Sequence, residues 1–174
     1  MKPLIICIVG ESGTGKTTIA DYIEKTYKIP MIQSYTDRRP RFEGETGHTF
    51  VSKLEFDLFD KKDMIAYTKF GDYRYCCLKS DVLELNTYVI DEDGLKYLKK
   101  NFSNIYNLKT IRIVRQKGDR IDSVGLDRVR RDDNVFNIPL EDFDYLITNC
   151  GPIKDLYFKT DCIMREIFDE RNTI

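Results

Sequence analysis

The sequence predicts an α/β fold in which a mainly parallel sheet is flanked by helices. Three observations lead to this prediction. Short apolar runs, typical of strands that are buried on both faces, alternate along the chain with stretches of helical apolar spacing. A glycine-rich loop lies between the first apolar run and the first helical stretch. Two segments of different character, 34–80 and 115–134, interrupt the alternation. The pattern therefore indicates strand–helix–strand units with two additions.

The apolar runs define the expected sheet. The run from Leu4 to Val9 is continuous and ends at Gly10, which suits a strand buried inside a parallel sheet. The other expected strands are 87–91, 110–114 and 144–148. Apolar residues recur at helical spacing in 17–27, 94–98 and 153–167. Since helices follow strands in this order, we expect parallel strands joined by helical crossovers.

The two interruptions predict an insert and a lid. Residues 33–80 contain short alternating pieces such as "HTFVS" and "YRYCCL", which indicate a small subdomain with strands of its own. Residues 115–134 are rich in arginine and poor in core residues, so they form either a solvated helix and loop or a mobile cover over a phosphate site. We expect a single domain over 1–174, divided into a core (1–32, 81–114 and 135–174), the insert (33–80) and the lid (115–134).

Composition limits the classes of function. The 174 residues correspond to about one domain. The 28 basic and 29 acidic residues nearly cancel, which does not favour nucleic-acid binding. The five cysteines are odd in number and irregularly spaced, as expected for reduced thiols rather than disulfides or a zinc site. No apolar run reaches membrane length, and the first run is too short for a signal peptide. We expect a cytoplasmic protein.

Residues 10–18, "GESGTGKTT", fit the phosphate-loop pattern G-x-x-x-x-G-K-[ST] between a strand and a helix. Glycines let successive backbone N–H groups face one polyphosphate, and the helix adds the positive end of its dipole. Lys16 would reach the terminal phosphates, and the Thr17 hydroxyl is placed for Mg²⁺. The predicted ATP-binding residues of the loop are Gly10, Glu11, Ser12, Gly13, Thr14, Gly15, Lys16, Thr17 and Thr18. The motif predicts ATP or GTP with Mg²⁺, but not the reaction.

A second anion site is indicated by "SYTDRRPRF" at 34–42. Arg38, Arg39 and Arg41 repel one another and flank Pro40, so neither a helix nor a central strand explains the cluster. One arginine guanidinium can donate two hydrogen bonds to the oxygens of a phosphate, and two arginines neutralise a dianion better than one. The alternative is an exposed basic loop without a ligand.

These segments together resemble the guanylate kinase family. That family joins its phosphate loop to S-x-T-T-R-x-P-R, then G-E, a further glycine, an aromatic residue and F-V-S. This chain has "SYTDRRPR", Gly44-Glu45, Gly47 and "HTFVS". "FGDYRYC" is similar to the family's F-x-G-x-Y-Y-G with one residue fewer, "VIDEDG" to its Asp-x-x-Gly, and "FDYLITN" to its closing strand and asparagine. The similarity runs in order over most of the chain.

The resemblance implies an ATP-dependent nucleoside monophosphate kinase that uses Mg²⁺ and a guanine nucleotide. It implies that Arg38 and Arg41 grip the phosphate of the acceptor nucleotide and that the Tyr75 hydroxyl donates to it. His48, the single histidine of the chain, stands where the family has another phosphate-binding tyrosine. A structural role for Tyr75 or His48 is the alternative.

The same resemblance assigns Ser34 and Asp91 to the guanine base, and Asp91 also to Mg²⁺ through water. Two positions depart from the family. Its base-reading glutamate falls on Ala66, and a base-reading serine or threonine falls on Cys77. We therefore expect GMP or dGMP to be preferred with weaker discrimination than the family pattern gives.

In the lid, "DRVRRD" resembles the family's lid helix, although the lid of this chain is shorter. The resemblance makes Arg128 and Arg131 candidates to clamp the transferring phosphoryl group, with Arg120 a weaker third. Each could instead be a surface arginine. "ITNCG" places Asn149 beside the adenine pocket.

Three other functions stay open. One is a kinase of the same architecture with another phosphorylated acceptor, such as a different nucleotide or a ribose bisphosphate. Another is a guanylate-kinase-like interaction module, which the intact "GTGKTT" disfavours. The third is a nucleotide-dependent switch, for which the sequence has no guanine-reading N-K-x-D element. The sequence gives no expectation for the oligomeric state.

Overall fold

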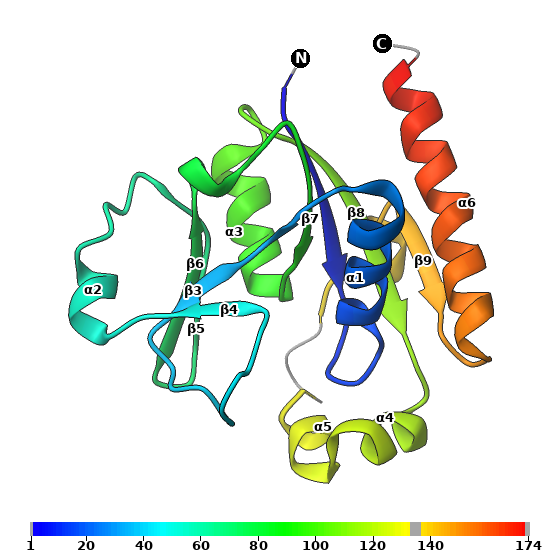
Figure 1. Ribbon diagram of the computed structural model, residues 1–174, viewed down its shortest axis with the longest axis horizontal. Coiled ribbons are helices and arrows are strands. Elements are labelled where there is room, and N and C mark those ends of the chain that lie inside the picture. Colours follow the sequence, from blue (N-terminus) through cyan, green and yellow to red (C-terminus); the bar gives the residue numbers. More distant parts are fainter. Residues whose placement is uncertain (1, 133–136, 173–174) are drawn as a thin grey trace.

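The central sheet of the computed structural model has five parallel strands in the order β2-β7-β1-β8-β9 (Figure 1). The structure describes residues 2–132 and 137–172. The strands are β1 (Leu4–Val9), β2 (Met31–Ile32), β7 (Leu85–Val89), β8 (Asn107–Val114) and β9 (Tyr145–Thr148). The predicted α/β fold with a parallel sheet is confirmed.

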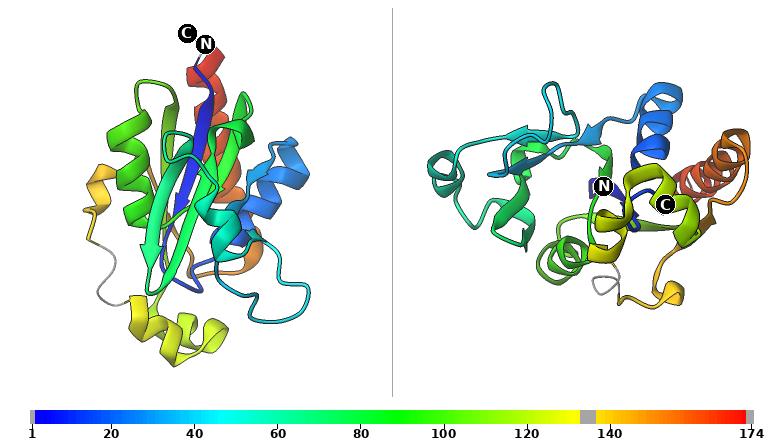
Figure 2. Two further views of the ribbon diagram at one scale, coloured as in Figure 1. Left: turned by 90° about the vertical axis from the view of Figure 1, so that its left-hand side faces the viewer. Right: turned by 90° about the horizontal axis from the view of Figure 1, so that it is seen from below.

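Helices cover both faces of this sheet (Figure 2). The helices are α1 (Lys16–Tyr27), α3 (Glu92–Phe102) and α6 (Ile153–Asn172). Because side chains alternate along a strand, Ile6 and Ile8 of β1 pack with α1 and α6, whereas Ile5 and Cys7 pack with α3. All four of these side chains are fully buried. The continuous apolar run of β1 therefore reflects a strand with a core on each side.

The segment between β2 and β7 forms a second sheet, at the left of Figure 1, with the strand order β4-β3-β6-β5. Its elements are β3 (Ser34–Thr36), β4 (His48–Phe50), α2 (Lys53–Asp57), β5 (Met64–Phe70), β6 (Tyr73–Leu78) and the short 3-10 helix η1 (Lys79–Asp81). Helix α2 starts with a capping box, in which Ser52 and Glu55 each bond the other's backbone N–H.

Strand β5 contains a bulge. The β5–β6 register shifts between Ile65 and Thr68, and Ala66 has a φ of 53° in the left-handed region. Such a bulge re-aims the side chains of a strand. Ala66 and Ile65 consequently pack with the α3 side of the central core.

Two short helices, α4 (Lys117–Val124) and α5 (Leu126–Asp132), form the segment predicted as a lid, below the carboxyl end of the sheet in Figure 1. A 3-10 helix, η2 (Leu140–Asp142), precedes β9. The bounds assigned to core, insert and lid stay predictions. No helix in the described residues has both the length and the apolar character needed to cross a membrane.

Candidate active site

The predicted phosphate loop connects β1 to α1 at the carboxyl end of the central sheet. Two of its glycines have left-handed backbone angles, with φ of 80° at Gly13 and 104° at Gly15. Side chains disfavour this conformation. A Cβ at Gly10 would lie 2.6 Å from the carbonyl oxygen of Ile113. The backbone path therefore explains all three glycines of the motif.

Lys16 begins helix α1, with its side chain folded back over the loop. Its ammonium donates to the carbonyl oxygens of Gly10, at 2.7 Å, and Glu11, at 2.9 Å. Burial lowers the pKa of Lys16 to about 8, while the negative charge of Asp132 acts in the opposite direction. Lys16 is thus a positioned cation that is mostly protonated at neutral pH.

Two polar side chains hold the loop in shape. Thr14 is fully buried and donates its hydroxyl to the Glu11 carbonyl at 2.9 Å. Asn149, directly after β9, donates its side-chain amide to the Thr14 carbonyl at 2.8 Å. Thr17 is exposed at the start of α1, and Thr18 is half buried. Asn149 therefore braces the loop, and its implied place beside adenine stays a prediction.

Three lid side chains contact a single loop residue, Ser12. Arg120 donates from Nε to the Ser12 carbonyl at 3.0 Å, and Arg128 donates from Nη2 to the Ser12 hydroxyl at 3.5 Å. The Asp132 carboxylate accepts the Ser12 backbone N–H at 2.5 Å. Arg120, ranked below Arg128 from the sequence, is the more closely bound of the two arginines. The side chain of Arg131 lies outside the described residues.

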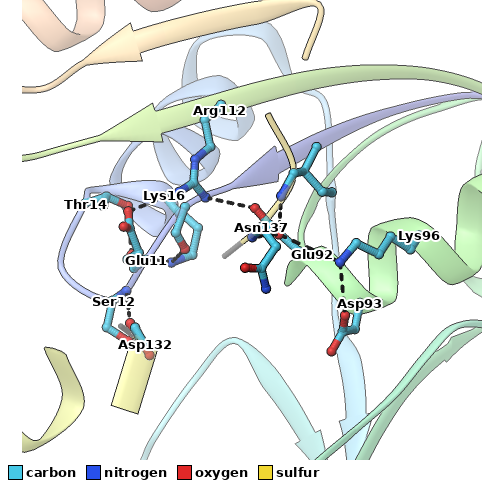
Figure 3. A network of polar contacts seen from close by, with 12 residues as sticks. Glu11, Ser12, Thr14, Lys16, Glu92, Asp93, Lys96, Arg112, Asp132 and Asn137 are labelled. Carbon is cyan, nitrogen blue, oxygen red and sulfur yellow. Dashed lines mark hydrogen bonds and ion pairs between the residues drawn. The ribbon is translucent and has the colours of Figure 1, made fainter. Parts of the chain in front are cut away.

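A charged network links the loop to α3 (Figure 3). The Glu11 carboxylate lies 3.3 Å from the Arg112 guanidinium and 3.4 Å from that of Arg120. Arg112 in turn lies 3.9 Å from Glu92, whose side chain is fully buried. Glu92 accepts the backbone N–H groups of residues 137 and 138, at 2.6 and 2.9 Å. The network therefore ties the phosphate loop to the chain that follows the lid.

Sequence reasoning missed Arg112, Glu92 and Asp132. Arg112 had a visible signal, because "TIRIV" places an arginine inside an apolar strand, where a buried charge needs partners. Glu92 and Asp132 lie in polar helical segments and had no such signal. Their role depends on contacts with residues distant in sequence.

Arg38 of the arginine segment is buried and paired with Glu45. Its Nη1 and Nη2 groups each donate to one carboxylate oxygen at 3.0 Å. Nη1 also donates to the Arg39 carbonyl, and Nε donates to the Tyr75 hydroxyl at 3.2 Å. Four of its five N–H groups are thus engaged, which leaves one Nη2–H for a ligand within the described part of the chain. The hydrogen bonds from Arg38 lower the pKa of Glu45 to about 2.

The other predicted phosphate-binding side chains lie beside this pair. Arg41 also contacts Glu45, at 3.2 Å, but its side chain is 44% exposed. The rings of His48 and Tyr75 are 5.6 Å apart. Burial lowers the pKa of His48, and its Nδ1 is a buried atom without a hydrogen-bond partner among the described residues. A buried polar nitrogen without a partner is typical of a site that receives a ligand or water.

Of the predicted base-binding positions, Ser34 and Ala66 line the cavity, whereas Cys77 lies in the core. Ser34 is buried, and its hydroxyl is 2.8 Å from the Tyr88 hydroxyl. Ala66 lies in the β5 bulge and lines the cavity, as does Thr68 two residues later. Cys77 is fully buried in the core beside α3, and burial raises the pKa of its thiol. Ala66 and Thr68, rather than Cys77, therefore form the cavity wall.

Asp91 lies just after β7 and caps helix α3, accepting the Gly94 N–H at 2.6 Å. Burial raises the pKa of Asp91. Its position at the carboxyl end of a strand next to β1 brings it to the same sheet edge as the phosphate loop. Among the described residues, no group of three or more His, Cys, Asp or Glu side chains is arranged to hold a metal ion.

One cavity of about 530 Å³ joins these parts, a size that fits a small-molecule ligand. The predicted site residues that line it are Gly10, Ser12, Lys16, Ser34, Arg38, Arg41, His48, Tyr75 and Asp91. Asp132 of the lid lines it as well. The structure thus brings the phosphate loop and the arginine segment to one cavity.

Comparisons with known proteins find similarity to guanylate kinases, both in sequence and in fold. The chain is 36% identical over 112 residues to a guanylate kinase of Clostridium tetani (strain Massachusetts / E88), a match that covers 58% of this chain and 53% of that protein. The crystal structure of guanylate kinase from Anaplasma phagocytophilum has the same fold, with a TM-score of 0.69 and 19% identity over 95% of this chain and 86% of that chain.

The chain therefore shares its fold with one guanylate kinase and, over 112 residues, sequence similarity with another. The sequence match spans about half the length of the curated relative. No protein-family model matches the chain.

Proposed function

We propose that the chain is an ATP-dependent nucleoside monophosphate kinase that transfers the γ-phosphate of ATP to GMP or dGMP. The observation that carries this proposal is the shared cavity, which both Lys16 of the phosphate loop and the Arg38–Arg41 segment line. Direct phosphoryl transfer needs donor and acceptor phosphates side by side among fixed cations. The similarity to a guanylate kinase supports a guanine nucleotide as acceptor.

Different residues would bind the donor phosphates and the acceptor phosphate. The loop N–H groups and Lys16 bind the donor phosphates and neutralise the charge of the group in transfer. Arg41, the remaining N–H of Arg38 and the Tyr75 hydroxyl hold the acceptor phosphate. Since this transfer is mainly positioning and charge neutralisation, no covalent enzyme intermediate is needed. Arg128 and Arg131 of the lid would complete the clamp and help to exclude water.

Mg²⁺ would accompany ATP in this proposal. The exposed Thr17 hydroxyl and, through water, the Asp91 carboxylate would hold it together with phosphate oxygens. These oxygen donors, few in number, fit an ion that prefers oxygen ligands and keeps several of its waters. When bound, Mg²⁺ supplies charge neutralisation to the phosphates.

Base recognition is the part in which this chain departs from the guanylate kinase pattern. Guanine offers N1–H and N2 amino donors that need acceptors. Ser34 and Asp91 offer oxygens, whereas Ala66 offers only a methyl group to the cavity. Each missing hydrogen bond costs about 0.5–1.5 kcal/mol of discrimination. We infer a guanine preference that is weaker than a carboxylate at this position would give.

A related kinase with another phosphorylated acceptor is the second candidate, favoured by the same change at Ala66. An interaction module is less well supported, because it has no use for the positioned Lys16 ammonium. The division into core, insert and lid, and a cytoplasmic setting, belong to the same proposal.

The proposal is tested by measuring ADP release from Mg·ATP with GMP, dGMP, AMP, CMP, dTMP and ribose 1,5-bisphosphate as separate acceptors. We expect GMP or dGMP to give the highest kcat/KM. ADP release that is equally fast without any acceptor would identify an ATPase. A preference for another acceptor by about tenfold or more, equivalent to about 1.4 kcal/mol, would reject the guanine assignment and leave the kinase assignment standing.

A further inference from the structure

The backbone N–H of Ser12 is bound by a carboxylate of the lid. Asp132 at the end of α5 accepts this N–H at 2.5 Å, while Arg120 of α4 donates to the carbonyl of the same residue at 3.0 Å. Asp132 is only 7% exposed and lines the same cavity as Lys16. An acidic side chain therefore lies at the mouth of a loop whose N–H groups serve to bind phosphate.

A phosphate oxygen bound by the loop would occupy the position beside the Ser12 N–H that the Asp132 carboxylate now occupies. The Ser12 N–H is a single donor, and two anions that approach it together repel each other strongly in a partly buried site. Asp132 also acts on Lys16, because its charge opposes the lowering of the Lys16 pKa that burial causes. An incoming polyphosphate would meet both a donor already in use and a nearby negative charge.

We propose that Asp132 is a built-in competitor of the ATP phosphates, so that ATP binds only when the end of α5 releases Ser12. This inference rests on the proposed function, since it takes the phosphate loop to be the ATP site. It adds that ATP binding is coupled to movement of the lid. ATP affinity is then lower than the loop alone would give, and the lid changes position on ATP binding.

Arg120 has contacts with the loop besides its ion pair with the Asp132 carboxylate, which is 3.8 Å long. Its guanidinium donates to the Ser12 carbonyl and lies 3.4 Å from the Glu11 carboxylate. Release of Asp132 therefore need not detach α4 from the loop. If Asp132 instead fastened the lid in its active position, or helped to bind Mg²⁺, its loss would weaken ATP binding. The two roles thus predict opposite changes in ATP affinity.

The test is calorimetric titration of Asp132→Asn with ATP and, separately, with inorganic tripolyphosphate, each with and without Mg²⁺. The variant removes the charge at nearly constant shape. We expect it to bind both probes about 10-fold more tightly than the unsubstituted protein, because a charge-assisted hydrogen bond no longer has to be broken. Asp132→Glu, which keeps a carboxylate, should show no such gain.

Asp127→Asn is the matched control. It removes the same charge from the first turn of the same helix, where Asp127 is exposed. Its affinity for both probes should equal that of the unsubstituted protein. Thermal unfolding of each variant checks the fold, and Asp132→Ser serves as a second uncharged variant if Asp132→Asn does not fold.

Unchanged or weaker ATP binding by the folded Asp132 variants would overturn this inference while leaving the proposed kinase intact. An equal gain in Asp127→Asn would also overturn it, because it would reveal a general charge effect. If neither the unsubstituted protein nor Asp132→Asn binds ATP or tripolyphosphate, the proposed function itself fails, and this inference fails with it.

Discussion

At the scale of residues, the cations of the site are held by oxygen acceptors of the protein itself. Arg38 forms an ion pair with Glu45, and the Lys16 ammonium donates hydrogen bonds to two loop carbonyls. Pairing of this kind offsets the cost of placing a charge in a partly buried site. Removal of Arg38 would leave a buried Glu45 carboxylate with less compensation, so it would affect folding as well as binding. The accessible Arg41 is therefore the better probe of the acceptor site.

Lys16→Ala tests the donor side of the site. We expect kcat to fall at least ~100-fold, the scale for loss of a main electrostatic stabiliser, with little change in thermal stability, because the loop is held by backbone and Thr14 contacts. Steady-state kinetics with saturating ATP and GMP measures the effect. Lys25→Ala, on the exposed side of the same helix, is the control. Near-normal turnover in Lys16→Ala would remove the loop from the mechanism.

Arg41→Ala tests the acceptor side. We expect GMP binding to weaken by ~1.5–3 kcal/mol, the value of a hydrogen bond to a charged group, and ATP binding to stay the same. Titration calorimetry with each nucleotide measures both. Arg39→Ala is the matched control, since Arg39 is an exposed neighbour whose carbonyl, not its side chain, contacts Arg38. Equal losses of ATP and GMP affinity would contradict the assignment.

Ala66→Glu tests base selectivity. A carboxylate at this position of the cavity wall could accept from guanine, and the left-handed φ of 53° is already borne by a residue with a Cβ. We expect the ratio of kcat/KM for GMP over AMP to rise about tenfold, the value of one charge-assisted hydrogen bond. An unchanged ratio in a folded, active variant would mean that Ala66 does not face the base.

At the scale of elements, the loop between β3 and β4 depends on Glu45. The folded-state pKa of Glu45, about 2, lies below its ordinary 4.5, chiefly because of the hydrogen bonds from Arg38. Since the folded state holds this proton less tightly than the unfolded state, the stabilisation is present above about pH 4.5 and is lost as the pH falls towards 2.

We therefore expect the free energy of unfolding to fall more steeply with acid in the unsubstituted protein than in Glu45→Gln. Urea unfolding at neutral pH and at about pH 3 measures the two slopes. Glu43→Gln, an exposed neighbour, should keep the slope of the unsubstituted protein. Parallel slopes in all three proteins would show that the Arg38–Glu45 pair contributes nothing measurable.

Local patterns predicted the elements whose signals are contained within a few residues. The apolar run of β1, the glycines of the loop and the spacing of α1 were all readable in this way, and all are confirmed. Strands β2 and β3 were not predicted, because strands of two and three residues are too short to show periodicity. Strand β5 was not predicted individually either, because its bulge interrupts the alternation of side chains. The helix at the C-terminus extends beyond the predicted 153–167 to Asn172.

Motifs indicated those residues of the candidate site that lie close together in sequence, whereas contacts between distant parts of the chain left no signal. Ser12 and Asp132 are 120 residues apart in sequence, and nothing near either one indicates the other. The Arg112–Glu92 pair likewise joins a strand to a separate helix. The β5 bulge, which sets the cavity wall at Ala66, is a feature of pairing with β6 and has no local signature.

At the scale of the whole molecule, the parallel sheet provides a fixed base for two smaller parts. The loop after β1 and Asp91 after β7 lie at one sheet edge, because these strands are parallel neighbours. The second sheet brings the arginine segment to the cavity, and the lid brings Asp132 and Arg120 to the loop. Closure of such parts over two nucleotides would exclude water as a competing acceptor.

The central claim is that one cavity receives both phosphates and that transfer between them is direct. A single-turnover reaction of GMP with ATP labelled in its γ-phosphate tests this claim. The label is followed in the protein, in inorganic phosphate and in the nucleoside diphosphate. We predict that the label moves from ATP to GDP without passing through the protein, and that Lys16→Ala and Arg41→Ala both slow this step. Label that appears mainly as inorganic phosphate, or first on the protein, would contradict the account.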